Sequence, residues 1–164
     1  MTPYQYQFTI KSIEAHAATG AALVLPTAQQ DATLRVRLLP VDAQTLASEL
    51  AGIGTARSRL AQTCCRLVQE LDGSLEGVEL QRGAGNLVEA QLVVRTGAGS
   101  LQLPVAFSDG IALALANRLP VHGDSSLAPL LERADQQLDQ RAPEDAVVAM
   151  PASFASFVNS LPDF

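Results

Sequence analysis

The chain has 164 residues, 48% of them hydrophobic, which is enough for one compact domain with a sizeable core. Only 17% of the residues are charged, and a formal net charge of −6 gives an isoelectric point of about 4.8. An acidic chain does not have the electrostatic profile of a tight, non-specific nucleic-acid binder, so any nucleic-acid contact has to come from a local arginine patch.

Cysteine, histidine and hydropathy exclude further classes of protein. Cys64 and Cys65 are adjacent in one helical pattern and point in different directions, so we expect no disulfide framework. Two histidines without a Cys-x-x-Cys pair make no recognisable zinc motif. No apolar run approaches the roughly 18 residues of a membrane span. The N-terminus has neither the charged nor the apolar region of a signal peptide. We therefore expect a cytoplasmic protein that has no contact with a membrane.

Strands dominate the beginning of the chain. Apolar and polar residues alternate over residues 4–14, which predicts a first strand that is kinked or ends near Ile13. Residues 21–26 form a short apolar strand. A third strand over residues 34–38 carries arginines on its outer face.

Two helices follow these strands. Pro40 opens the first, which has Asp42 in its first turn and ends before the glycines at positions 52 and 54. The second is predicted over residues 55–71. Its apolar residues form one stripe, and we expect Cys64 in this stripe to be a small buried hydrophobic residue. The members of the stripe are Leu60, Cys64, Leu67, Val68 and Leu71.

The second half of the chain repeats this order of elements. Three more strands are predicted over residues 75–80, 87–95 and 100–105. A helix then begins with Ser108 as its N-cap and Asp109 in its first turn, where a carboxylate is favourable. The six residues from position 111 are apolar on all sides, so this helix should be buried.

The C-terminal part is predicted to contain two more helical segments. After a brief extended piece at 121–122, Ser125 or Ser126 caps an amphipathic helix over residues 127–138. We place the domain at residues 1–140. Residues 141–164 then form a linker and a short helical tail whose apolar stripe docks on its own domain or across a dimer.

A weak internal repeat supports this division. Asp42-Ala-Gln-Thr-Leu-Ala and Asp109-Gly-Ile-Ala-Leu-Ala share their acidic start and their Leu-Ala end, and each follows three predicted strands. The fold class is therefore predicted as α+β, with a mostly antiparallel sheet packed with helices. It is built from two strand-strand-strand-helix halves, and the helix over residues 55–71 lies between them.

The chain resembles the bifunctional nuclease domain family in three separated places. Ser108-Asp-Gly-Ile-Ala-Leu-Ala, followed by Leu-Pro-Val, is similar to the family's Arg-Pro-Ser-Asp-Ala-Ile-Ala-Leu-Ala helix and its Pro-Ile strand. The segment at Asp42 is similar to the family's Glu-Ala-x-Ala-Ile. The ending from Phe154 to Phe164 looks like the Phe-x-x-Phe-Leu…Pro-Glu-Asp-Phe of many bacterial members. The resemblance implies an α+β nuclease that depends on a divalent metal.

The chain also departs from the family's pattern at charged positions. Residues 34–39 replace Leu-Pro-Ile-Trp-Ile-Gly, residues 60–63 replace Thr-His-Asp-Leu, and residues 104–107 replace Asp-x-Arg-Pro. A His, two Asp and an Arg are thereby lost. A nuclease needs a metal, or a general base with a cationic clamp, to stabilise developing charge on a phosphodiester. The alternative to a nuclease is therefore a catalytically degenerate structural or protein-interaction module.

Three residues at matching positions are the candidate catalytic residues: Asp42, Ser108 and Asp109. If the internal repeat brings the two helix N-termini to one cleft, Asp42 and Asp109 can hold Mg²⁺ or Mn²⁺ together with waters, because Mg²⁺ often takes only one or two protein carboxylates. Each carboxylate also has a simpler interpretation, as a favourable first-turn charge on its helix.

Basic residues give the candidate nucleic-acid contacts. They lie on the third strand and at the start of the second helix, and they are Arg35, Arg37, Arg57 and Arg59. The competing interpretation is that they belong to a solvated strand face and a solvated helix face. As partners we expect a second copy of the chain, with a dimer favoured, and nucleic acid only if these arginines form one patch.

Overall fold

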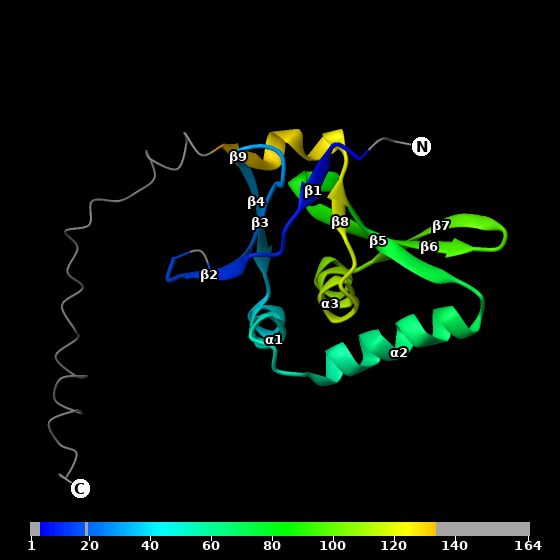
Figure 1. Ribbon diagram of the computed structural model, residues 1–164. Helices are drawn as coiled ribbons and strands as arrows, with labels where there is room; N and C mark the ends of the chain where they lie inside the picture. Colours follow the sequence, from blue (N-terminus) through cyan, green and yellow to red (C-terminus); the bar gives the residue numbers. More distant parts are fainter. Residues whose placement is uncertain (1–3, 19, 134–164) are drawn as a thin grey trace, which may run out of the picture. The chain divides into compact units, whose positions relative to one another are not determined.

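The structure is a computed structural model, and it describes residues 4–18 and 20–133 of the chain (Figure 1). These residues form nine strands in two sheets, three α-helices and two short 3₁₀ helices. The helices are α1 (Pro40–Leu50), α2 (Ala56–Glu70) and α3 (Phe107–Asn117), with η1 (Ala84–Asn86) and η2 (Ser125–Leu130). The strands are β1 (Tyr6–Phe8), β2 (Ser12–His16), β3 (Gly20–Pro26), β4 (Ala32–Leu38), β5 (Ser74–Arg82), β6 (Val88–Thr96), β7 (Gly99–Val105), β8 (Val121–Gly123) and β9 (Leu131–Arg133).

The element order confirms the α+β class and the two repeated halves. β2, β3 and β4 form an antiparallel meander followed by α1, and β5, β6 and β7 form a second meander followed by α3. The predicted insertion between the halves is α2. The strands form two sheets, in the orders β2-β3-β4-β9 and β1-β8-β5-β6-β7. All pairs are antiparallel except β5 with β8.

The strand predicted over residues 4–14 is in fact two strands in different sheets. β1 pairs with β8, whereas β2 pairs with β3. Between them, Phe8 makes an isolated bridge to Thr27, and the Thr9 amide donates to the Pro26 carbonyl at 3.0 Å. The chain thus crosses from one sheet to the other at residues 9–11, before the break that the sequence pattern placed near Ile13, which is itself a residue of β2.

The core lies around α3, as its apolar sequence predicts. Ile111 is fully buried, and Ala112 and Ala114 are nearly so. Gly110 lets the helix come close to the five-stranded sheet, because a Cβ there would lie 3.2–3.3 Å from the side chains of Ala90, Val105 and Val78. α3 also contacts α1 and α2, so it joins the two halves.

The predicted helix over residues 127–138 is wrong. A 3₁₀ helix occupies Ser125–Leu130, and Leu131–Arg133 is the strand β9, which pairs with β4. Asp124 caps η2 by accepting from the Ser126 amide, and Pro129 inside it has no N–H to continue a helical ladder. Residues 134–140, the linker at 141–150 and the tail at 151–164 lie outside the described residues.

The predicted burial of the α2 stripe is also wrong for four of its five members, whereas Val68 is partly buried against the core. Cys64 is exposed, as are Leu60, Leu67 and Leu71. The helix packs instead through the neighbouring face, whose small residue Ala61 is buried and whose carbonyl accepts from Asn117 Nδ2 of α3 at 3.3 Å. The small side chain lets the two helices approach closely.

No helix in residues 4–18 and 20–133 is long and apolar enough to cross a membrane.

The N-terminus of α2 is fixed by a capping box. Thr55 Oγ1 accepts from the Ser58 amide at 3.0 Å, while Ser58 Oγ accepts from the Thr55 amide at 2.8 Å. Thr55→Ala is expected to lower the free energy of unfolding by about 1 kcal/mol. Urea unfolding measures this, with Thr63→Ala in the middle of α2 as the control, expected within about 0.5 kcal/mol of wild type. An equal loss in both variants would contradict the role of the cap.

Candidate functional site

One arginine joins the two carboxylates that the internal repeat predicts. Asp42 is the third residue of α1 and Asp109 the third residue of α3. Arg57, the second residue of α2, lies between them. Its Nη2 donates to Asp42 Oδ1 at 3.0 Å and lies 3.4 Å from Asp109 Oδ1. The two carboxylates therefore lie no farther apart than the sum of these distances.

Local sequence explains why the three side chains converge. Each carboxylate lies in the first turn of its helix, where it interacts favourably with the partial positive charge of the N-terminus. The capping box at Thr55 sets the first turn of α2 and thereby the position of Arg57. Three helix N-termini from different parts of the sequence thus share one ion-pair cluster. We call Asp42, Arg57 and Asp109 the N-terminal cluster.

The members of the N-terminal cluster differ in exposure. The Asp42 side chain is 15% exposed, the Arg57 side chain 31% and the Asp109 side chain 54%. Asp42, with the shorter contact and the lower exposure, holds the guanidinium in place. Asp109 faces solvent. Arg57 Nη1 is buried and has no hydrogen-bond partner among the described residues.

The donors of the N-terminal cluster do not form a ready metal site. Mg²⁺ often takes only one or two protein carboxylates, but here the guanidinium of Arg57 already occupies the contact between the two. Among residues 4–18 and 20–133, no three His, Cys, Asp or Glu side chains come together as a metal site. A divalent cation at this place would have to displace Arg57 from the same two carboxylates.

Ser108 is not the N-cap of α3, contrary to the sequence prediction. The helix begins at Phe107, its N-cap is Ala106, and no side chain caps it. Ser108 is instead the second residue of the helix and is partly buried beside Asp109. The helix therefore begins two residues earlier than a Ser108 N-cap would place it.

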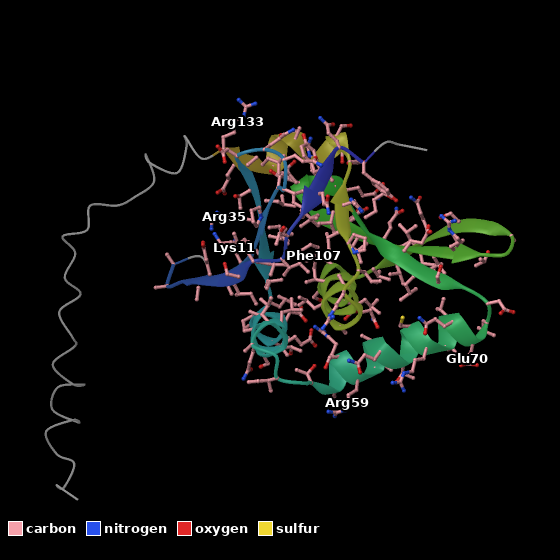
Figure 2. All side chains as sticks on the ribbon, viewed as in Figure 1. Lys11, Arg35, Arg59, Glu70, Phe107 and Arg133 are labelled. Carbon is pink, nitrogen blue, oxygen red and sulfur yellow. The ribbon has the colours of Figure 1, made fainter. Side chains whose placement is uncertain are left out.

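The four predicted nucleic-acid-binding arginines do not form one face. Arg35 on β4 is paired with Glu14 and with Glu132, whose Oε2 is 2.8 Å from Arg35 Nε. Arg57 belongs to the N-terminal cluster. Figure 2 shows Arg35 beside the four-stranded sheet and Arg59 at the start of α2, well apart. Arg37 lies on β4 with Arg35 and is exposed.

Residues 23–150 match the family model of the bifunctional nuclease domain. The chain belongs to the bifunctional nuclease domain family. The matched residues include all three members of the N-terminal cluster. No curated protein shows significant similarity to the chain. Membership in the bifunctional nuclease domain family thus confirms the resemblance that three short motifs indicated.

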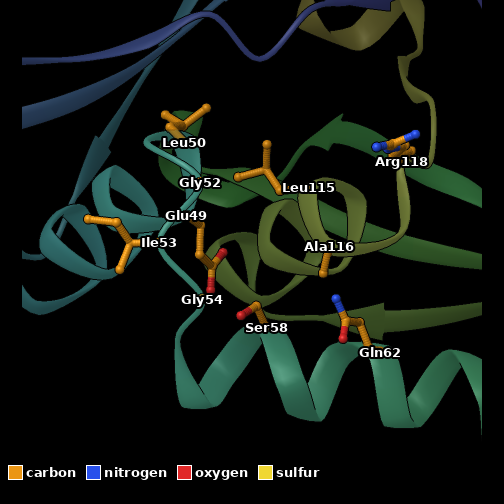
Figure 3. A pocket seen from close by; sticks show the side chains of 10 residues that line it. All are labelled: Glu49, Leu50, Gly52, Ile53, Gly54, Ser58, Gln62, Leu115, Ala116 and Arg118. Carbon is orange, nitrogen blue, oxygen red and sulfur yellow. The ribbon is translucent and has the colours of Figure 1, made fainter.

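A polar pocket lies at the other ends of α1 and α3 in this bifunctional nuclease domain (Figure 3). Its volume is about 320 Å³, and its polar lining includes Glu49, Ser58, Gln62 and Arg118. Glu49 Oε1 accepts from Thr55 Oγ1 at 2.7 Å, whereas Glu49 Oε2 is buried with no hydrogen-bond partner among the described residues. Neither Asp42 nor Asp109 lines this pocket, so it is distinct from the N-terminal cluster.

A second group of titratable residues lies on the five-stranded sheet. The His122 ring stacks on Tyr4 at 4.5 Å between centroids, and both line a pocket of about 260 Å³. Beside His122 on β5 is Glu79, which is only 7% exposed and accepts from Gln102 Nε2 at 2.6 Å. Burial, and then the charge of Asp124, raises the pKa of Glu79. The apolar neighbours of Glu79 in the sequence gave no sign of a buried carboxylate, and sequence reasoning missed it.

Removing Arg57 should convert the N-terminal cluster into a cation site. Arg57→Met leaves two carboxylates without their counter-ion, and we expect a loss of about 1–2 kcal/mol of unfolding free energy, less than for a fully buried pair because all three groups are partly exposed. Millimolar Mg²⁺ should restore part of this loss by binding the folded state. Thermal unfolding with and without Mg²⁺ measures both effects. Arg66→Met on exposed α2 surface is the control, and an equal response to Mg²⁺ in both variants would contradict the competition.

The His122 stack should make the protein sensitive to mild acid. Burial lowers the pKa of His122 below its ordinary 6.5, so the folded state disfavours the imidazolium. The free energy of unfolding therefore decreases as the pH falls from about 6.5 through the lowered pKa of His122. His122→Phe keeps a ring against Tyr4 and should remove this part of the loss between pH 7.5 and 5.5. Urea unfolding at the two pH values measures it, and an unchanged slope would exclude His122 as the cause.

Proposed function

We propose that this protein hydrolyses phosphodiester bonds of nucleic acid at the N-terminal cluster. One observation supports the proposal above the others: Arg57 Nη2 lies within 3.4 Å of both carboxylates at the family's two helix entrances. A guanidinium beside carboxylates supplies the two elements that phosphodiester hydrolysis needs, a cationic group for the phosphate and a base for water. Membership in the bifunctional nuclease domain family supports the same reaction class.

The exposures assign different roles to the two carboxylates. Asp109, more than half exposed, is the proposed general base, and Asp42 is a positioning residue that holds Arg57. A water oxygen attacks phosphorus while Asp109 accepts the water's proton. The bond from phosphorus to the leaving sugar oxygen breaks, and that oxygen takes a proton from solvent. Arg57 stabilises the negative charge that develops on the phosphoryl oxygens.

The second candidate is a catalytically degenerate interaction module. The observation that favours it is that the charged groups of the candidate sites are already paired and that the chain is acidic. Both carboxylates are already paired with Arg57, Arg35 is paired with two glutamates, and the chain carries a net charge of −6. A long-range field of this sign repels nucleic acid and slows encounter with it.

Isosteric substitutions separate the two functions. Labelled single-stranded RNA and plasmid DNA are incubated with the full chain in Mg²⁺, in Mn²⁺ and in a chelator. Asp109→Asn keeps the shape of the side chain but removes the base, and we expect cleavage to fall by about 100-fold or more. Asp42→Asn should reduce cleavage through the loss of its hold on Arg57.

Asp31→Asn is the matched control, because Asp31 is an exposed aspartate in the loop between β3 and β4. It should retain the wild-type rate. Cleavage that persists in Asp109→Asn would remove the site assignment. A wild-type chain that cleaves neither substrate under any of the three conditions would favour the interaction module.

A further inference from the structure

The longest helix of the described chain presents an apolar stripe to solvent. Leu60, Leu67 and Leu71 are 64%, 60% and 74% exposed, and Cys64 between them is exposed as well. The intervals are four, three and four residues. This is the spacing of the a and d positions of a heptad, which places all four side chains in one line along a helix. We call Leu60, Cys64, Leu67 and Leu71 the α2 seam.

Exposed apolar residues also lie at the start of α1, whose Asp42 pairs with Arg57. Arg57 lies three residues before Leu60 and occupies the next seam position. Its partner Asp42 follows Val41, which is 66% exposed, and Leu39 is exposed as well. A seam of two heptads is too short to hold two chains by itself. Exposed apolar surface of this kind marks a protein interface when a partner covers it.

The charges of α2 indicate the direction in which a second helix would lie. Acidic residues are absent from its first turn and basic residues from its last turn. Instead Arg59 is near the N-terminus and Glu70 is the last residue, at opposite ends of the helix in Figure 2. This distribution opposes the helix dipole. An antiparallel copy of the same helix compensates for this distribution, because the basic end of each helix then lies beside the acidic end of the other.

We propose that α2 pairs with α2 of a second copy of this chain, antiparallel across a two-fold axis. A self-complementary patch is what a two-fold interface requires. In this pairing Leu60 packs against Leu71 of the partner subunit, and Cys64 packs against Leu67 of the partner subunit. Arg59 comes level with the acidic end of the partner helix. The proposal does not rest on the catalytic one, since no residue of the α2 seam belongs to the N-terminal cluster.

The oligomeric state of the full chain tests the proposal first. Sedimentation equilibrium should show a dimer for wild type. Leu67→Glu places a charge in the centre of the α2 seam and should raise the dissociation constant by about 30-fold or more. The matched control is Leu87→Glu, since Leu87 is an equally exposed leucine outside the seam. A monomeric wild type, or a dimer that survives Leu67→Glu, would overturn the proposal.

A charge exchange tests the antiparallel direction. Arg59→Glu and Glu70→Arg should each weaken the dimer by about fivefold, because each places like charges level with each other. The double variant exchanges the two ends and should regain wild-type affinity. A parallel pair behaves differently: residue 59 then faces residue 59 of the partner subunit, and the double variant gains nothing. Failure of the double variant to recover would overturn the antiparallel pairing.

A disulfide provides a second readout that does not depend on affinity. In a Cys65→Ser background, Leu67→Cys places a new thiol opposite Cys64 of the partner subunit, and mild oxidation should give a covalent dimer. With Leu71→Cys in the same background, the new thiol lies opposite Leu60 of the partner subunit and should give little cross-linking. Equal cross-linking of the two variants would contradict the register.

Discussion

The contact on which the site depends is the sharing of Arg57 by two carboxylates from opposite halves of the chain. Asp42 begins α1 of the first half and Asp109 begins α3 of the second. Neither sheet connects these two positions directly. The inserted helix α2 supplies the cation that keeps two like charges close together, and without it their repulsion would oppose the packing of α1 on α3. The cluster therefore couples the geometry of the candidate site to the assembly of the two halves.

This coupling also explains why the same residues support two opposed functions. A fully paired cluster stabilises the fold and presents little free charge to a phosphate. The solvent exposure of Asp109 points the other way, because an accessible carboxylate can accept a proton from a water molecule beside a bound phosphate. The contrast with Arg35 is informative. Arg35 is also held by two partly exposed carboxylates, but these come from the strands β2 and β9 and not from the first turn of a helix.

Sequence periodicity predicted the parts of the fold that depend on local pattern. The second meander, α1, α2 and α3 all follow from alternation, turn residues and helical spacing, and the repeated Asp-x-x-x-Leu-Ala pattern correctly placed an acid in the first turn of α1 and of α3. What failed depends on tertiary contacts. Residues 131–133 form a strand because they pair with the edge of β4. No pattern in residues 127–133 predicts this pairing. The role of Arg57 was missed for the same reason, since its partners are 15 and 52 positions away in the sequence.

The α2 stripe shows most clearly how pattern and burial differ. Apolar spacing identified the stripe correctly, but spacing cannot say what covers it. Two faces of α2 were available for packing on α3, and the domain uses the one with Ala61, because a small residue allows the closer approach. The larger leucines are left on the flank, in line with Arg57. In the pairing we propose, this flank is where a second chain binds, and the helix that interrupts the internal repeat then serves both contacts: Arg57 joins the halves of one chain, and the leucines beyond it join two chains.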